Sequence, residues 1–351
     1  MRSWLPHLPF LGDKSALVKG TNPASLVASS FLILIVIGAL LLRSDWATHV
    51  PISWSDALFT ATSAVTVTGL AVLDTDTHYT TAGQMVLLVL VQLGGIGIMT
   101  FAALTLLLLG HQLGIGEQRL VREAMNHTRV MDLGWLIKRI FVLVFVIELV
   151  GFLLLSVILI PDQGWLTGSF HALFYSISAF NNAGFALTSE SLVPKAGHWP
   201  LALVLGSLAV IGGLGFTVLA ELRLRTRWSA MSLHSRLMLS GTAILLLFTF
   251  VVFLLCEWSN PATLGSYDTS EKLAIGFFHA IVPRSAGFNM VDIGSLTLAV
   301  TMLYIVLMFI GAGTNSSGGG IKVTTFMVLI LSTRAFLSGR TTPSVFGRSI
   351  P

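Results

Sequence analysis

Three short turns in this chain hold residues that could replace the water shell of a small cation. Each turn contains a glycine, and none contains a carboxylate. Glycine adopts backbone angles that let successive carbonyl groups face one direction, and a ring of such carbonyls can coordinate a potassium ion. Calcium or magnesium would more often require carboxylates. The turns therefore predict a filter for a monovalent cation, made of Thr66, Val67, Thr68 and Gly69, then Asn182, Ala183 and Gly184, and then Ser285, Ala286 and Gly287.

One fifteen-residue segment occurs three times in the chain, and each copy contains one of these turns. Placing the glycines of the turns in one column aligns residues 56–70, 171–185 and 274–288 without a gap, and the first two copies share six residues. Each copy begins with a short apolar stretch and lies between two long apolar runs. A short helix that enters a membrane and returns points the partially negative end of its dipole inward. The repeats therefore predict a cation pathway built from span, short descending helix, glycine turn and span.

Composition indicates that lipid surrounds the chain. Hydrophobic residues make up 54% and charged residues 10% of the 351 residues, and the mean hydropathy is +0.85. A helix needs about 20 apolar residues to cross the hydrocarbon layer. The sequence therefore predicts an all-α integral membrane protein, in which repeated span–pore helix–span units surround a central pore. Six principal spans, with a further apolar run at 326–331, are expected at residues 24–42, 84–109, 140–160, 201–220, 237–256 and 295–312.

The distribution of basic residues predicts the orientation of these spans. With a cytoplasmic N-terminus, fifteen of the twenty Lys and Arg residues lie on the cytoplasmic side, as the positive-inside rule requires. The glycine turns then enter from outside. The net charge of +4 reflects this orientation, so no nucleic-acid partner is expected, and the single cysteine, Cys256, allows no disulfide within the chain. We expect a multi-pass protein of the plasma membrane, the inner membrane of a bacterium.

A glycine- and serine-rich segment interrupts an apolar region that otherwise runs from residue 303 to residue 331. Unwound backbone inside a membrane must line a cavity or be shielded by protein. In the predicted orientation the segment lies below the glycine turns, where a flexible polar plug would gate the pore. An ordinary loop between two shorter helices is the alternative. The candidate gate residues are Gly313, Thr314, Asn315, Ser316, Ser317, Gly318, Gly319, Gly320 and Lys322.

Other small or polar residues in the spans give weaker signals. Glycines recur at 93–97 and 211–215, and small residues at this spacing let helices pack closely. We therefore expect packing there, and no nucleotide bound by this chain itself.

Glu148 lies deep in a span, where carboxylates are commonly functional, although a packing contact explains it equally well. Arg284, next to the third turn, either repels approaching cations or bonds backbone carbonyls.

These motifs resemble the Trk/Ktr/HKT superfamily of potassium transporters and are most similar to its bacterial Ktr-type membrane subunit. The similarity covers residues 24–351, includes the three turns in the family's order, and extends to residues 317–325, which resemble the family's intramembrane gate loop. In this family, glycine at one key position of each filter segment accompanies potassium selectivity, and Gly69, Gly184 and Gly287 match those positions. The resemblance implies K⁺ as the transported ion, held by backbone carbonyls of the filter residues.

The same resemblance implies partners. Members of the family pair as dimers, so a homodimer in the lipid bilayer is expected. A cytosolic ring of nucleotide-binding regulatory subunits, of the RCK/KTN type, is the expected regulatory partner, and ATP or ADP would bind to that ring. Na⁺ is implied as a candidate activator.

The family builds one pore from four covalently linked repeats, whereas this sequence contains three. We therefore expect the 351 residues to be a fragment of a longer polypeptide, rather than a three-repeat protein that another chain completes. The predicted divisions are a cytoplasmic segment 1–23, repeat 1 at 24–112 with filter 66–70, a linker 113–138, repeat 2 at 139–222 with filter 182–185, a linker 223–235, repeat 3 at 236–333 with filter 285–288 and gate loop 313–322, and a linker 334–351 toward the absent repeat.

Two alternatives remain open beside potassium uptake. A channel for Na⁺ or ammonium would use the same scaffold, and an inactive fragment of the transporter would carry no flux. An enzyme within the membrane is a third class of protein. Its candidate groups show no spacing that pairs a nucleophile with a base, so we do not expect an enzyme; these groups are Ser207, Ser316, Ser317, His171 and His279.

Overall fold

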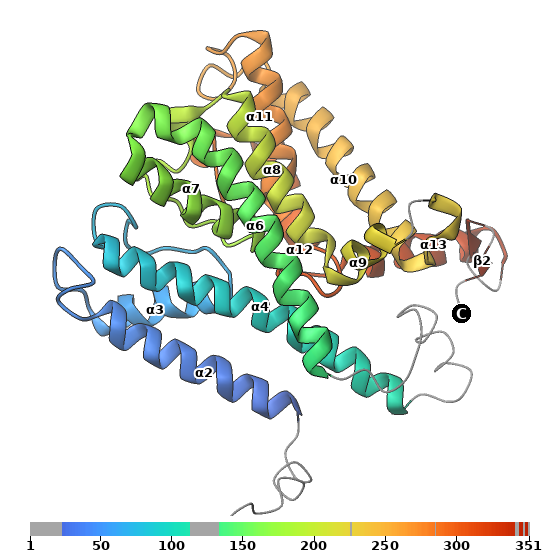
Figure 1. Cartoon of the computed structure of the whole chain (residues 1–351). Coiled ribbons are helices and arrows are strands. Elements are labelled where there is room, and N and C mark those ends of the chain that lie inside the picture. The colour runs from blue at the N-terminus through green and yellow to red at the C-terminus, as the bar shows by residue number, and fades with distance from the viewer. Residues whose placement is uncertain are drawn as a thin grey trace, which may run out of the picture.

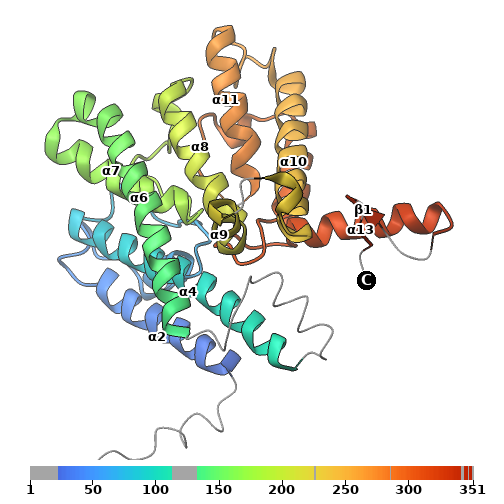
Figure 2. The same ribbon diagram turned by 45° about the vertical axis from the view of Figure 1, so that its right-hand side comes forward.

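The computed structural model describes residues 23–112, 133–224, 227–284, 286–340, 344–346 and 348–349. Helices account for most of these residues, in agreement with the predicted all-α class. The predicted N-terminal segment and most of the 113–138 linker lie outside the described residues, as does Ser285 of the third turn. Three helical groups follow one another in chain order, from blue through green to orange (Figures 1 and 2).

The first group consists of α2 (Pro23–Leu42), α3 (Trp54–Val65) and α4 (Thr81–Gln112). Ser53 caps α3, because its hydroxyl oxygen accepts a hydrogen bond from Asp56 N at 3.1 Å, and such a cap satisfies a free N–H of the first turn. With 12 residues, α3 is too short to cross a membrane. It packs against both α2 and α4.

The second group consists of α6 (Leu133–Gln163), α7 (Trp165–Phe180), α8 (Trp199–Leu214) and α9 (Phe216–Leu224), with a 3-10 turn at Val193–Lys195. The predicted span over 201–220 is divided between two helices. α8 and α9 meet at an angle of 100°, and together they are long and apolar enough for one span. Gly215 lies at the break with a φ of +87°, which glycine adopts without the steric cost that other residues incur. As a result, α9 runs beside α10.

The third group consists of α10 (Leu233–Glu257), α11 (Thr269–Ile281), α12 (Leu298–Phe309) and α13 (Val323–Leu337), with 3-10 turns at Trp228–Ala230, Val282–Arg284 and Ile293–Ser295. A capping box starts α11: Asp268 accepts from Glu271 N at 2.8 Å, and Glu271 accepts from Asp268 N at 3.0 Å. The predicted interruption of the last span is present between α12 and α13. Beyond it, α13 projects sideways from the bundle and precedes a short antiparallel hairpin, β1 (Ser344–Val345) and β2 (Arg348–Ser349) (Figure 2).

Three described helical segments are long and apolar enough to cross a membrane by themselves, and a fourth is present if the bent pair α8–α9 is taken as one span. The three segments are Thr81–Thr100, Lys138–Gln163 and Leu233–Glu257. The outward faces are apolar: Val157 is 76% and Leu255 is 77% exposed, as expected where the neighbour is lipid. Shorter apolar helices occupy the remaining predicted spans, namely Ala28–Leu42, Leu298–Phe309 and Val323–Leu337.

The buried core lies around the short helices α3, α7 and α11. Small side chains predominate on their buried faces, such as Ala61 and Ala64 on α3 and Ala172 and Ala179 on α7, all with no exposed area. Small side chains let neighbouring backbones approach closely. This core therefore fixes where the C-terminal ends of the three short helices point, and those ends lead into the three glycine turns.

Candidate ion-selectivity site

The first two glycine turns begin in the same way, although 115 residues separate their glycines. In the first, Thr68 N donates to Ser63 O at 2.8 Å; in the second, Ala183 N donates to Ser178 O at 2.8 Å. Each bond joins an N–H to the carbonyl five residues earlier, one residue more than in an α-helix. Bonds of this kind satisfy the free carbonyls at helix C-termini. The sequence repeat is therefore also a repeat of backbone geometry.

The backbone of all three turns enters the left-handed region. The glycines Gly69, Gly184 and Gly287 have φ values of +79°, +74° and +73°. In the first two turns, Val67 and Asn182 also have positive φ, at 55° and 57°. For residues other than glycine this conformation is strained and persists only where the surroundings determine it, commonly at functional sites. Such turns orient successive carbonyl groups differently from a helix or strand.

The structure brings the three glycines together. A Cβ atom added to Gly69 would lie 2.1 Å from the carbonyl oxygen of Ala183 in the second turn. A Cβ atom added to Gly184 would lie 2.6 Å from the Cα atom of Gly287 in the third turn. Both positions are closer than van der Waals contact allows, and the obstacle is backbone that cannot rotate away. Any side chain at these positions would therefore push the turns apart.

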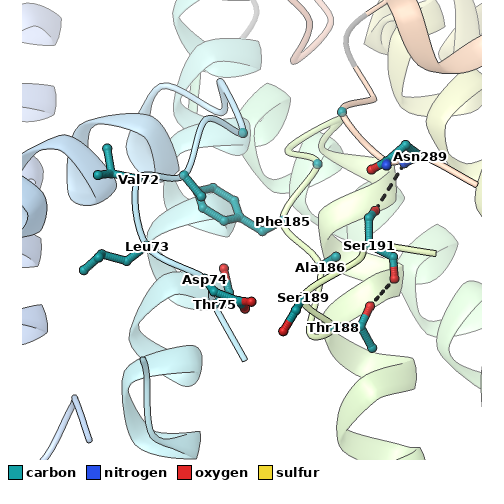
Figure 3. Close-up of a pocket in the computed structure, with 14 residues that line it drawn as sticks. Val72, Leu73, Asp74, Thr75, Phe185, Ala186, Thr188, Ser189, Ser191 and Asn289 are labelled. Atoms are coloured by element: carbon teal, nitrogen blue, oxygen red, sulfur yellow. Dashed lines mark hydrogen bonds between the residues drawn. The ribbon is translucent and has the colours of Figure 1, made fainter. Parts of the chain in front are cut away.

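A pocket of about 240 Å³ opens on one side of the three glycines. Figure 3 shows the side chains around it, which come from the chain segments that leave the three turns. Asp74 is the acidic residue among them. The pocket leads from the surface to the point where the turns meet, and its lining residues are Gly69, Ala71, Val72, Leu73, Asp74, Thr75, Gly184, Phe185, Ala186, Thr188, Ser189, Ser191, Gly287 and Asn289.

The predicted gate segment forms an ordered loop between α12 and α13. Its two ends pair with each other, since Ile321 N donates to Phe309 O at 3.0 Å and Ala312 N donates to Gly319 O at 3.2 Å. Lys322 folds back, and its Nζ donates to Gly318 O at 2.6 Å. The polar residues at the tip are buried: Asn315, Ser316 and Ser317 are each at most 3% exposed.

This loop docks into the break between α8 and α9. Gly313 N donates to Gly213 O at 2.7 Å, and Phe216 N donates to Asn315 O at 3.0 Å. The broken helix therefore supplies a free carbonyl and a free N–H to the loop, groups that a continuous helix would have used itself. A Cβ atom at Gly215 would lie 2.2 Å from Thr314 O. The loop also reaches the second turn, where Asn182 Nδ2 lies 3.5 Å from Ser317 Oγ.

The sequence model of the TrkH family, described as a cation transport protein, matches residues 7–351. The chain belongs to the TrkH family. Among curated relatives, it is 44% identical over 329 residues to the Ktr system potassium uptake protein B of Bacillus subtilis, covering 94% of this chain and 74% of the relative. It is 42% identical to the protein of the same name from Vibrio alginolyticus, covering 95% and 73%. It is 36% identical to the potassium/sodium uptake protein NtpJ of Enterococcus hirae, covering 96% and 75%.

A solved structure has the same fold. The crystal structure of the potassium transporter TrkH from Vibrio parahaemolyticus matches with a TM-score of 0.70 at 20% identity, over 95% of this chain and 67% of the other. Membership of the TrkH family confirms that the chain is a transport protein and not an enzyme. Two of the groups considered for enzymatic chemistry have structural partners: Ser316 Oγ donates to Gly313 O at 2.6 Å, and His279 Nε2 accepts from Met290 N at 3.1 Å.

In this TrkH-family chain, His279 holds the segment that leaves the third turn. It has no exposed area, and its Nε2 accepts a hydrogen bond from Met290 N at 3.1 Å. Its Nδ1 lies 2.9 Å from the Tyr304 hydroxyl. The second repeat has a counterpart, since Leu187 N donates to the Tyr175 hydroxyl at 3.3 Å. Sequence reasoning missed this role, because the partners are distant in sequence and differ in type between repeats.

Replacing His279 with leucine should lower the stability of the protein. The change leaves the buried N–H of Met290 without an acceptor, and an unsatisfied buried donor costs about 1–3 kcal/mol. The melting temperature of the detergent-solubilised protein measures the effect. Tyr304→Phe is the matched control, because it leaves the bond between Met290 and His279 in place. Tyr304→Phe removes the partner of the other ring nitrogen and shows what that contact contributes. A melting temperature of His279→Leu equal to that of wild type would mean that the bond to Met290 has no stabilising role.

Proposed function

We propose that this chain forms the pore of a potassium uptake system in the bacterial plasma membrane. The observation that carries the proposal is the convergence of Gly69, Gly184 and Gly287 in left-handed turns at the base of an open pocket. The residues of the three turns would form the selectivity filter, with K⁺ held by backbone carbonyls. Two relatives at 44% and 42% identity carry the name potassium uptake protein B, which supports this choice of ion.

A sodium-conducting form of the same pore is the second candidate. It is favoured by the relative that is named potassium/sodium uptake protein NtpJ, at 36% identity. Ammonium transport on the same scaffold is a further form of this alternative. We favour potassium because glycine occupies the key position in all three turns, where a serine hydroxyl would alter the spacing of the carbonyls.

Uptake by the full chain in proteoliposomes tests the proposal. Rubidium influx should be blocked by external K⁺ and far less by equal concentrations of Na⁺ or ammonium. Competition by Na⁺ equal to that by K⁺ would replace the proposal with the second candidate. Absence of influx, with folded protein in the vesicles, would contradict a transport role for this polypeptide by itself.

We further propose that the loop at 313–322 is the gate, on the cytoplasmic side of the filter. Support comes from its burial and from its contacts to Gly213, Phe216 and Asn182, because a gate must reach the conduction path. The predicted cytoplasmic N-terminus, from the positive-inside distribution, is part of the same proposal.

The proposed assembly is a homodimer with a cytosolic ring of nucleotide-binding regulatory subunits. Two relatives are named as parts of a Ktr system, and a system implies a further component. Nucleotide would bind to the ring, and Na⁺ would act as an activator.

A further inference from the structure

A closed ring of three polar side chains lies directly behind the second glycine turn, within the bundle. Gln92 Nε2 donates to Glu148 Oε2 at 2.8 Å. Asn181 Nδ2 donates to Glu148 Oε1 at 3.1 Å and to Gln92 Oε1 at 3.0 Å. Each of the three side chains contacts the other two. The ring therefore ties together α4 of the first repeat, α6 of the second repeat, and the end of α7.

The ring is buried in a part of the protein where charge is expensive. Glu148 is 5% exposed and Asn181 has no exposed area, and α6 is one of the membrane-crossing helices. A carboxylate at such a depth is retained only with partners and commonly serves function. A carboxylate only accepts hydrogen bonds, so Glu148 turns the amide N–H groups of both neighbours toward itself. This orientation leaves Gln92 Oε1 free to accept from Asn181.

Asn181 connects the ring to the turn. It is the C-cap of α7, and the next residue, Asn182, is the one with a φ of 57°. A residue of this kind keeps such a conformation only where its surroundings determine it. The space around Asn181 is tightly filled, since a Cβ atom at Gly95 would lie 1.9 Å from Asn181 Oδ1. The cap cannot shift without moving the second turn.

Among the described residues of the other two repeats, no such ring occurs at this position. The residue aligned with Asn181 is Thr66 in the first repeat, and its hydroxyl donates to Thr62 O of its own helix at 2.8 Å. In the third repeat the aligned residue is Arg284. A purely local cap is therefore sufficient to end one of these helices. The second repeat instead connects its cap to helices of two repeats.

We propose that Glu148, acting through Gln92 and Asn181, is a positioning residue for the second glycine turn and thereby a determinant of selectivity for K⁺ over Na⁺. The inference rests on the proposed function, because it assigns a role within the proposed filter. Glu148 does not touch the ion. It fixes the direction of the carbonyl groups that would do so, through two side-chain contacts.

The test is the ratio of K⁺ to Na⁺ uptake by the full chain in proteoliposomes, measured for Glu148→Gln. An amide in place of the carboxylate turns one acceptor into a donor, which then faces the N–H group of a neighbour. We expect the ratio to fall about tenfold, the scale of one lost buried hydrogen bond. A ratio within about twofold of wild type would overturn the proposal, because a difference of that size is expected when a substituted residue does not act on the filter.

A double variant separates positioning from general damage. In E148Q/Q92E the carboxylate and the amide exchange places. Every hydrogen bond of the ring can then re-form: the amide at 148 donates to the carboxylate at 92, and both accept from Asn181. We expect the double variant to regain most of the wild-type ratio. If it stays as low as Glu148→Gln, the closed ring is not what positions the turn.

Glu257→Gln is the matched control for loss of a buried carboxylate. Glu257 has no exposed area, and it accepts from Thr297 N at 2.8 Å and from Thr263 Oγ1 at 2.7 Å, at the C-terminal end of α10 and outside the ring of Gln92, Glu148 and Asn181. This variant should lower stability without changing the uptake ratio. An equal change of ratio in Glu257→Gln would overturn the proposal, because it would mean that any lost carboxylate bond disturbs selectivity.

Two further measurements distinguish failure of the positioning role from misfolding and from failure of the proposed function. If Glu148→Gln does not yield folded protein, Gln92→Met takes its place, because it removes both bonds of Gln92, to Glu148 and from Asn181, and leaves the bond between Glu148 and Asn181. An unchanged ratio in Gln92→Met then overturns the proposal. If the wild-type protein itself does not discriminate K⁺ from Na⁺, the proposed function fails, which the wild-type measurement reveals independently of the variants.

Discussion

Replacing Gly69 with serine should lower the preference for K⁺ over Na⁺ by about ten- to a hundredfold, which corresponds to about 1.4–3 kcal/mol. Two costs add at this position. The φ of Gly69 is +79°, a conformation that costs a residue with a side chain about 1–3 kcal/mol. The new Cβ atom would also lie 2.1 Å from Ala183 O, so the first and second turns must separate. The measurement is the ratio of K⁺ to Na⁺ uptake in proteoliposomes.

Gly164→Ser is the matched control for Gly69→Ser. Gly164 has nearly the same φ, +81°, but a Cβ atom there would meet nothing within 4 Å. It lies between α6 and α7, away from the three turns. This variant carries the backbone strain without the collision, so its uptake ratio should equal that of wild type. If Gly69→Ser also leaves the ratio unchanged, the first turn does not line the conduction path.

Deleting Thr314 to Gly318 should raise K⁺ flux about tenfold and leave the selectivity for K⁺ over Na⁺ unchanged. The deletion removes the buried tip of the gate loop and its bond from Phe216 N. If the lost contacts stabilise the closed state by about 1.4 kcal/mol, their loss raises the ratio of open to closed protein about tenfold. The initial rate of rubidium influx, normalised to the amount of folded protein, gives the flux.

Gly215→Ala is a smaller form of the same test. Its Cβ atom would lie 2.2 Å from Thr314 O, so the loop must leave the break between α8 and α9 while its own sequence stays intact. Flux should rise here too. A fall in flux in both variants, with protein that remains folded on size-exclusion chromatography, would show that the loop supports the pore and does not close it.

Both tests use the same physical distinction between the two parts of the proposed site. The three glycines meet backbone against backbone, so a change there alters the geometry that would contact the ion. The loop at 313–322 meets the second turn through side chains, with 3.5 Å between Asn182 Nδ2 and Ser317 Oγ. A change in the loop should therefore alter how often ions pass more than which ions pass.

The sequence by itself was sufficient for the class of protein and for the positions of the three glycine turns. Both depend on local signals: long apolar runs imply a lipid environment, and a repeated fifteen-residue segment with a glycine at one position implies a repeated turn. The interruption before α13 was also predictable, because serine and glycine at 313–320 break an apolar run in place.

Only the tertiary structure revealed the break at Gly215 and its use. In sequence, residues 211–215 look like 93–97, and both are consistent with close helix packing. Residues 93–97 lie within the continuous helix α4, whereas residues 211–215 end α8. The difference comes from the loop at 313–322, whose N–H and carbonyl groups bond to the broken backbone. A partner about 100 residues away leaves no local signal in the sequence.

The roles of Glu148 and His279 were likewise decided by tertiary structure. The sequence marked Glu148 as a carboxylate in a span and left its role open. Its partners Gln92 and Asn181 lie 56 and 33 residues away. For His279 the partner Tyr304 is 25 residues away. Hydrogen bonds between distant residues depend on how the helices pack, and packing depends on the whole chain. Residue type alone could therefore identify Glu148 and His279 as candidates, but it could not identify their hydrogen-bond partners.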